Sequence, residues 1–170
     1  MKKICIALLL LGTCMLSDIA SAGEVKVTWQ DPDNYTDIRP GNENRTSFRE
    51  QIFKELDQVF AGLAKKLPDD IQWNVTVTDL DLAGDVRPMM GAGVSEIRVV
   101  KEIYWPRMSF NYTMTDTKGA MVAEGKEDIS DMNFMMTRPI NIGNGSFPYE
   151  TKMIEDWFSK QIKNKKFPTK

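Results

Sequence analysis

The sequence Ile71–Val86, IQWNVTVTDLDLAGDV, decides the fold of this chain. Its first half alternates apolar and polar residues, which is typical of a strand with one buried face. The apolar positions are the odd ones: Ile71, Trp73, Val75 and Val77. From Leu80 the apolar residues fall on even positions, so one face stays buried only if an extra residue is inserted near Thr78–Asp79. The stretch therefore predicts a central strand over Ile71–Val77 that is followed by a β-bulge.

Other segments of the chain show the periods of further strands and of two helices. Alternation predicts strands over Glu24–Gln30, Ser95–Trp105, Met108–Met114 and Met121–Ile129. Pro106 leaves open whether Ser95–Met114 is one kinked strand or two elements. Apolar residues every three to four positions predict helices over Ser47–Leu67, with Ser47 and Glu50 as a capping box, and over Glu150–Lys165. We expect an α+β fold with one mainly antiparallel sheet of four to five strands and two helices packed on one face, in the order β-α-β-β-β-α.

Four segments lack a sustained period. Asp31–Asn44 is rich in turn-forming residues and predicts an ordered loop that returns to the core. Gly84–Gly93 predicts a flexible connection, and Ser130–Tyr149 a long irregular loop. Phe167–Lys170 is expected to fray at the end of the chain.

The first 22 residues have the three parts of a secretory signal. Lys2 and Lys3 precede the apolar run Ile4–Leu16, and small residues end at Ala22, so cleavage is expected before Gly23. We therefore expect a periplasmic protein with a single domain over residues 23–170. A lipid anchor on Cys14 is the alternative.

The composition of the expected mature chain excludes several kinds of chemistry. The sequence has no histidine, and both cysteines, Cys5 and Cys14, leave with the signal. Serine–histidine and cysteine–histidine nucleophiles and ordinary zinc sites are therefore excluded. Cleavage leaves 20 basic and 23 acidic residues, which argues against nucleic-acid binding. No stretch after residue 22 has the length of a membrane span, and no cofactor is expected.

Three aspartates beside the predicted bulge are the first candidate site. Asp79, Asp81 and Asp85 could share a hard cation, although they are too few to complete a calcium site. The structural alternative is that Asp79 caps a loop or accepts hydrogen bonds from free amides at the bulge, while Asp81 is solvated. As a hydrolytic pair, these carboxylates would need a second acid such as Glu124 or Asp131.

Methionine, aromatic and arginine side chains suggest two further sites. Methionine sulfur atoms can bind Cu(I), but they also fill irregular gaps in a core. The methionines concerned lie in the two irregular loops: Met89, Met90, Met132, Met135 and Met136. A second cluster combines the residue types that dominate binding interfaces: Arg98, Tyr104, Trp105 and Arg107. This cluster predicts a partner-binding surface, with arginines paired on the surface and Trp105 in the core as the alternative.

Five separated motifs resemble a bacterial exported family known as domain of unknown function 3016. They are VTWQDPDNYTDIR (Val27–Arg39), DLDLAG (Asp79–Gly84), IRVVKEIYWPR (Ile97–Arg107), EGKEDISDMNF (Glu124–Phe134) and EDWF (Glu155–Phe158). The resemblance implies a single exported domain and brings no activity, cofactor or catalytic residue. Residue types therefore carry the functional prediction. We expect a non-enzymatic periplasmic domain that binds an envelope protein or glycan, with a metal-binding or hydrolytic protein that uses Asp79 and Asp81 as the alternative.

Overall fold

A computed structural model describes residues 23–89, 95–136 and 145–170. The predicted signal segment, parts of the two irregular loops and Met90 lie outside the described residues. The elements follow one another as β1 (Glu24–Trp29), the short 3-10 helix η1 (Pro32–Asn34), α1 (Arg45–Ala64), β2 (Gln72–Asp81), β3 (Asp85–Met89), β4 (Ser95–Val99), β5 (Arg107–Thr115), β6 (Met121–Ser130) and α2 (Pro148–Lys163). Among these residues, neither helix combines the length and apolar character needed to cross a membrane.

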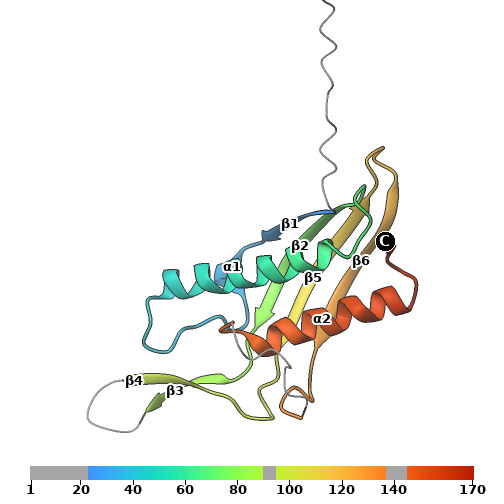
Figure 1. The fold of residues 1–170 in the computed structure, drawn as a ribbon. Coiled ribbons are helices and arrows are strands. Elements are labelled where there is room, and N and C mark those ends of the chain that lie inside the picture. Colours follow the sequence, from blue (N-terminus) through green and yellow to red (C-terminus); the bar gives the residue numbers. More distant parts are fainter. Residues whose placement is uncertain (1–22, 90–94, 137–144) are drawn as a thin grey trace, which may run out of the picture.

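The main sheet has four strands in the order β1-β2-β5-β6, and both helices cover one of its faces (Figure 1). This confirms the α+β class. The sheet is mixed because β1 runs parallel to β2, whereas β2, β5 and β6 are antiparallel neighbours. Helix α1 connects β1 to β2 and carries the chain back along the sheet, which is the connection that parallel neighbours require. The sheet is therefore mainly antiparallel, as expected, except for the pairing of β1 with β2. The expected order β-α-β-β-β-α was only partly right, because β3 and β4 form a second sheet between β2 and β5.

The predicted central strand and its bulge are both present in β2. Val77 pairs with Phe110 and Asp79 with Ser109, so Thr78 is the extra residue. Val77 and Leu80 are both fully buried although they are three positions apart. The insertion therefore keeps one face of β2 against the helices while its apolar positions change from odd to even.

The N-terminus of α1 differs from the predicted capping box. The side-chain oxygen of Asn44 accepts hydrogen bonds from the amides of Thr46 at 2.9 Å and Ser47 at 3.1 Å. The helix therefore begins at Arg45, and the assignment of Ser47 and Glu50 as a capping box was wrong. Asn44 satisfies free amides at the helix start in the same way and lies earlier in the chain.

The end of the chain is packed rather than frayed. Phe167 is 3% exposed, and its ring lies 5.2 Å from that of Tyr112 and 5.5 Å from that of Trp157. Lys170 forms an ion pair of 2.6 Å with Asp69. The prediction of a frayed end over Phe167–Lys170 was wrong because the aromatic core extends beyond α2.

Strands β3 and β4 form a separate hairpin that the sequence pattern did not predict. Asp85–Met89 pairs with Ser95–Val99, so the described part of the predicted flexible connection Gly84–Gly93 is mostly strand. Ser95–Trp105 is not one strand, because β4 ends at Val99 and a turn precedes β5. Ser95–Met114 is therefore two elements, which residues 100–106 separate, and β4 belongs to a different sheet from β5.

Candidate functional site

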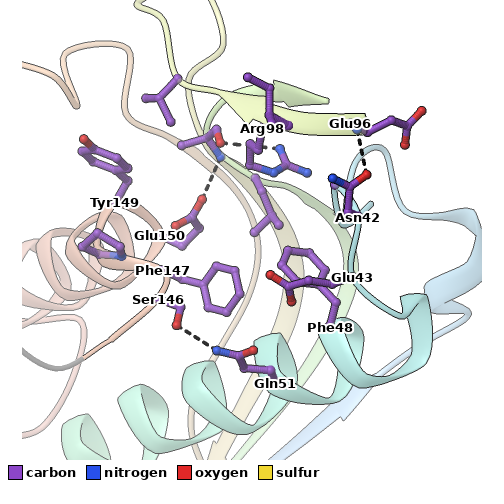
Figure 2. A pocket seen from close by; sticks show the side chains of 16 residues that line it. Asn42, Glu43, Phe48, Gln51, Glu96, Arg98, Ser146, Phe147, Tyr149 and Glu150 are labelled. Carbon is purple, nitrogen blue, oxygen red and sulfur yellow. Dashed lines mark hydrogen bonds between the residues drawn. The ribbon is translucent and has the colours of Figure 1, made fainter. Parts of the chain in front are cut away.

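Two cavities lie near the end of the main sheet where β2 meets the hairpin. The first, here called the helix cavity, has a volume of about 600 Å³. It is bordered by the first turn of α1, the first turn of α2 and strand β4, and its lining includes Phe48, Phe147, Arg98 and Glu150 (Figure 2). The arginine cavity has a volume of about 350 Å³. Its lining combines three carboxylates, two guanidinium groups, two aromatic rings and two further residues: Asp37, Asp81, Asp85, Arg39, Arg107, Tyr104, Trp105, Gly84 and Ile103.

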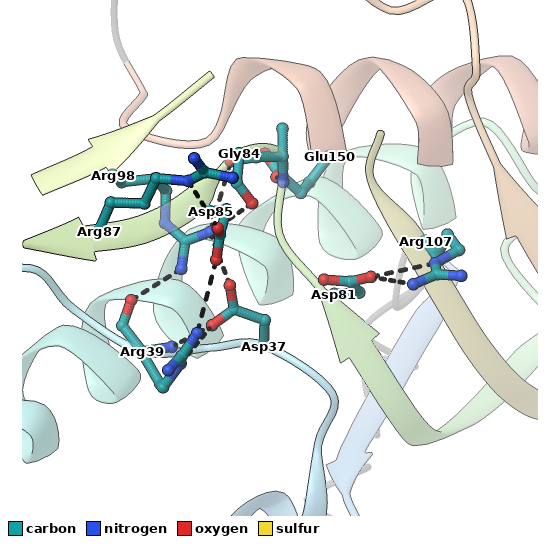
Figure 3. A network of polar contacts seen from close by, with 10 residues as sticks. Asp37, Arg39, Asp81, Gly84, Asp85, Arg87, Arg98, Arg107 and Glu150 are labelled. Atoms are coloured by element: carbon teal, nitrogen blue, oxygen red, sulfur yellow. Dashed lines mark hydrogen bonds and ion pairs between the residues drawn. The ribbon is translucent and has the colours of Figure 1, made fainter. Parts of the chain in front are cut away.

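Arg98 joins the hairpin to two other segments of the chain. Its guanidinium donates to the Asp37 carboxylate at 3.2 Å, to the Arg39 carbonyl at 2.7 Å and to the Gly84 carbonyl at 3.2 Å (Figure 3). The Arg98 side chain is 18% exposed and that of Asp37 is 10% exposed. These bonds use both terminal nitrogens of the guanidinium. Arg98 therefore holds the hairpin against the loop that carries Asp37 and Arg39, between the two cavities.

Ion pairs balance the charges in and around the arginine cavity. Arg39 contacts Asp37 at 3.2 Å and Asp85 at 3.7 Å, and Arg87 contacts Asp85 at 3.0 Å (Figure 3). Arg107 of β5 pairs with Asp81 on the neighbouring strand β2. Burial raises the pKa of Asp81, and the hydrogen bond and charge of Arg107 oppose that rise.

Asp79 lies at the bulge and holds a loop against the sheet. Its carboxylate accepts hydrogen bonds from the amide and the hydroxyl of Thr36, both at 2.7 Å, and from the amide of Leu80 at 2.9 Å. These contacts match the structural alternative for Asp79. The expectation that Asp81 is solvated was wrong, because its side chain is 15% exposed and pairs with Arg107. They fasten the loop between β1 and α1, which carries Asp37 and Arg39, beside the end of β2.

The three candidate aspartates do not converge on one point. Asp81 and Asp85 line the arginine cavity, whereas Asp79 faces Thr36. Within the described ranges, no group of three or more acidic, histidine or cysteine side chains is arranged to hold a metal ion. Glu124, on β6, and Asp131, just after it, line neither of the two cavities, so they do not join Asp81 there.

The candidate copper-binding methionines are exposed rather than buried in the core. Met89 is 49% exposed, Met132 64%, Met135 43% and Met136 81%. The interpretation that they fill gaps in the core was therefore wrong for these four. Core methionines come instead from the strands and α2: Met108, Met114 and Met153.

Three members of the predicted partner-binding cluster share the arginine cavity. Tyr104, Trp105 and Arg107 line it, and Arg98 lies behind it as the fourth member. Trp105 is half-buried, so it lies at the cavity rather than in the core. Arg87 bonds the hydroxyl of Tyr104 and lies 5.3 Å from the centre of its ring, which fixes this side chain beside the cavity.

Sequence reasoning missed Asp37, Arg39 and Glu150. Asp37 and Arg39 lie in a turn-rich loop whose position beside β2 depends on pairing between distant residues. Glu150 is 2% exposed and accepts a hydrogen bond of 2.7 Å from the amide of Ala83. Burial raises the pKa of the Glu150 carboxyl, against the effect of backbone amides and of the Arg98 charge. A glutamate in the first turn of a helix is so common that its sequence position gave no signal of burial.

Comparisons with known proteins give a family and little else. A crystal structure of a minor lipoprotein from Acinetobacter baumannii is 11% identical and aligns over 88% of this chain and 98% of that chain, with a TM-score of 0.27. No curated protein matches this chain. The family model described as "Protein of unknown function (DUF3016)" matches residues 23–160, which include all five motifs that suggested it. The chain therefore belongs to the DUF3016 family of proteins of unknown function.

Proposed function

We propose that this protein is a non-enzymatic binding domain of the bacterial envelope and that the arginine cavity is its binding site. One observation carries the proposal. The residues singled out for binding, Tyr104, Trp105 and Arg107, line a single cavity together with Asp81 and Asp85. Aromatic and arginine side chains that converge on one concave surface are the usual anchors of recognition sites.

The chemistry of the lining favours a glycan as the ligand. Carboxylates accept hydrogen bonds and guanidinium groups donate them, so together they suit sugar hydroxyls, which do both. Asp81 and Arg107 present such a pair on adjacent strands. Tyr104 and Trp105 add apolar ring faces against which a sugar ring can pack. Three acids and two arginines line the cavity, and Arg87 and Arg98 pair with two of these acids from outside it. The charges of the site are therefore nearly balanced, which favours a neutral ligand.

Export is part of the proposal and rests on the signal-like features of residues 1–22. Osmotic-shock fractionation of cells that express the full chain should release the protein with periplasmic markers. Recovery in the cytoplasmic fraction would contradict the envelope location. If the protein is labelled by a radioactive fatty acid and Cys14→Ala abolishes the labelling, the protein carries the lipid anchor instead.

Co-sedimentation with purified peptidoglycan tests glycan binding directly. The chain from Gly23 onward should sediment with peptidoglycan, and Trp105→Ala and Arg107→Ala should each reduce the bound fraction at least tenfold. The Arg107 side chain is 55% exposed, so its loss should leave the fold intact. Lys126→Ala, on the exposed strand β6, is the matched control and should bind like the parent. If the parent chain does not bind glycan but crosslinks to a protein that Trp105→Ala loses, the ligand is a protein and the glycan assignment is wrong.

A carboxylate-based metal or hydrolytic protein is the second candidate. The observation that favours it is the shared cavity of Asp37, Asp81 and Asp85, where burial raises the pKa of Asp81. All three acids already contact arginines, which opposes cation binding. A rise in the melting temperature with Ca²⁺, Mg²⁺ or Cu(I), or release of sugar products from peptidoglycan, would support this candidate. An unchanged melting temperature and undegraded peptidoglycan would exclude it.

A further inference from the structure

The helix cavity combines buried apolar walls with exposed apolar side chains at its opening. The rings of Phe48 and Phe147 meet edge to face with their centres 5.7 Å apart, and Leu82 is buried beside them. Ile97 is 40% exposed and Val100 is 37% exposed on the hairpin side of the cavity. A volume of about 600 Å³ with such a lining is typical of sites that bind a largely apolar group.

The charged side chains around this cavity are mainly acidic. Glu43, Glu96 and Glu150 line it, and Figure 2 shows Glu43 and Glu150 on opposite sides. Among the lining residues that the structure describes, Arg98 is the cation, and its guanidinium is already bonded to the Asp37 carboxylate and to backbone carbonyls. The cavity therefore favours a cationic group over an anionic one.

The two helix starts beside the cavity do not reverse this preference. A helix N-terminus ordinarily attracts anions through its free amides. Here Asn44 already accepts from the amides of Thr46 and Ser47 at the start of α1. At the start of α2, Pro148 occupies the first turn and has no amide hydrogen to offer an anion.

The hairpin edge that borders the cavity is blocked against addition of a strand. Asn42 accepts a hydrogen bond from the outward amide of Glu96 at 2.8 Å and donates to Ser95 at 2.6 Å. At the opposite edge of the hairpin, on β3, Pro88 pairs with Glu96 and has no amide hydrogen to offer an added strand. A partner must therefore be held by its side chains rather than by strand pairing.

We propose that the helix cavity is a second binding site, separate from the arginine cavity, for a basic peptide segment of a partner protein. A large apolar side chain of that segment enters the cavity and packs against the rings of Phe48 and Phe147. Flanking lysine or arginine side chains contact Glu43 and Glu96 at the opening. Ile97 and Val100 cover the inserted side chain from the hairpin side.

Fluorescence anisotropy with two synthetic peptides tests this proposal. One fluorescein-labelled peptide carries two leucines between two lysines, and the other has glutamates in place of the lysines. The lysine peptide should bind at least tenfold more tightly than the glutamate peptide. Ile97→Asn should weaken binding of the lysine peptide at least tenfold. The matched control Val122→Asn, at a β6 residue that is also 40% exposed, should bind like the parent chain.

A charge-reversal variant separates the acidic opening from the apolar walls. Glu43→Lys combined with Glu96→Lys should shift the preference at least tenfold toward the glutamate peptide, whereas Glu124→Lys on β6 should leave it unchanged. Equal binding of both peptides, or no binding of either at millimolar concentration, would overturn the proposal. A competition experiment with decyltrimethylammonium, a cationic amphiphile, tests the alternative ligand. If this compound displaces the labelled lysine peptide as readily as the unlabelled peptide does, the cavity is a site for amphiphiles and the peptide proposal is wrong. Trp105→Ala should leave peptide binding intact, because that residue lines the other cavity.

Discussion

Replacing Arg98 by alanine should loosen the β3–β4 hairpin from the rest of the domain. A two-stranded hairpin is marginally stable alone, so its position depends on contacts with other segments. Arg98 supplies three of these contacts: the Asp37 carboxylate at 3.2 Å, the Arg39 carbonyl at 2.7 Å and the Gly84 carbonyl at 3.2 Å.

The expected cost follows from the partners that Arg98 leaves behind. Hydrogen bonds that involve a charged group contribute about 1.5–3 kcal/mol each. Asp37 keeps its contact with Arg39, so its carboxylate is not left without a partner. We expect Arg98→Ala to lower the free energy of unfolding by about 3 kcal/mol, at the lower end of the cost of breaking a buried pair. Arg98→Lys should lower it by about 1.5 kcal/mol, because one ammonium cannot reach all of these acceptors.

Urea unfolding followed by tryptophan fluorescence measures this loss, since Trp73 is buried in the core. The melting temperature should fall by about 6–12 °C for a domain of this size. Exchange of the β3 and β4 amide hydrogens should become about 10²-fold faster. Arg107→Ala is the control and should lower the free energy of unfolding by less than about 1 kcal/mol, because its pair with Asp81 is more exposed. If Arg98→Ala is no less stable than Arg107→Ala, the reasoning is refuted.

Three further predictions concern the bulge, the end of the chain and the buried glutamate. Asp79→Ala should lower the free energy of unfolding by about 2 kcal/mol, and Asp79→Asn by about 1 kcal/mol, in urea titrations; equal values would show that the loop contacts contribute nothing. Phe167→Ala should lower the free energy of unfolding by about 3 kcal/mol, and a loss below about 1 kcal/mol would mean that the end of the chain is not part of the core. Burial raises the pKa of Glu150, so the folded state binds its proton more tightly than the unfolded state does. Stability should therefore fall as pH rises from near 4.5 toward the raised pKa, by up to about 1.4 kcal/mol per pH unit. Glu150→Gln should remove this fall in melting curves, and an unchanged pH profile in the variant would contradict the assignment.

The sequence predicts best where the pattern of a single strand carries the information. The change from odd to even apolar positions after Val77 requires an inserted residue, and Thr78 is that residue in the structure. The helical stripes likewise require a sheet face to cover them, and both helices cover the same face (Figure 1). In each case the burial of apolar side chains leaves one solution.

The sequence predicts poorly where position depends on contacts between distant segments. Strand β3 is short, partly exposed and contains Pro88, so it lacks a strand pattern. Phe167 follows the last helix, and its burial depends on the aromatic rings of β2, β5 and α2. Residue types alone found Tyr104, Trp105 and Arg107, but their convergence with Asp81 and Asp85 depends on the turn between β4 and β5.

The proposed role of the arginine cavity is to bind an envelope glycan. Titration of the ¹⁵N-labelled chain with peptidoglycan fragments, followed by NMR chemical shifts, tests it most directly. Shift changes should concentrate on the Trp105 indole and on the backbone amides of Gly84, Asp85 and Arg107, and Trp105→Ala should abolish the amide changes. Shift changes that concentrate on the face of the main sheet opposite the helices, or an unchanged spectrum at millimolar ligand, would contradict glycan binding in the arginine cavity.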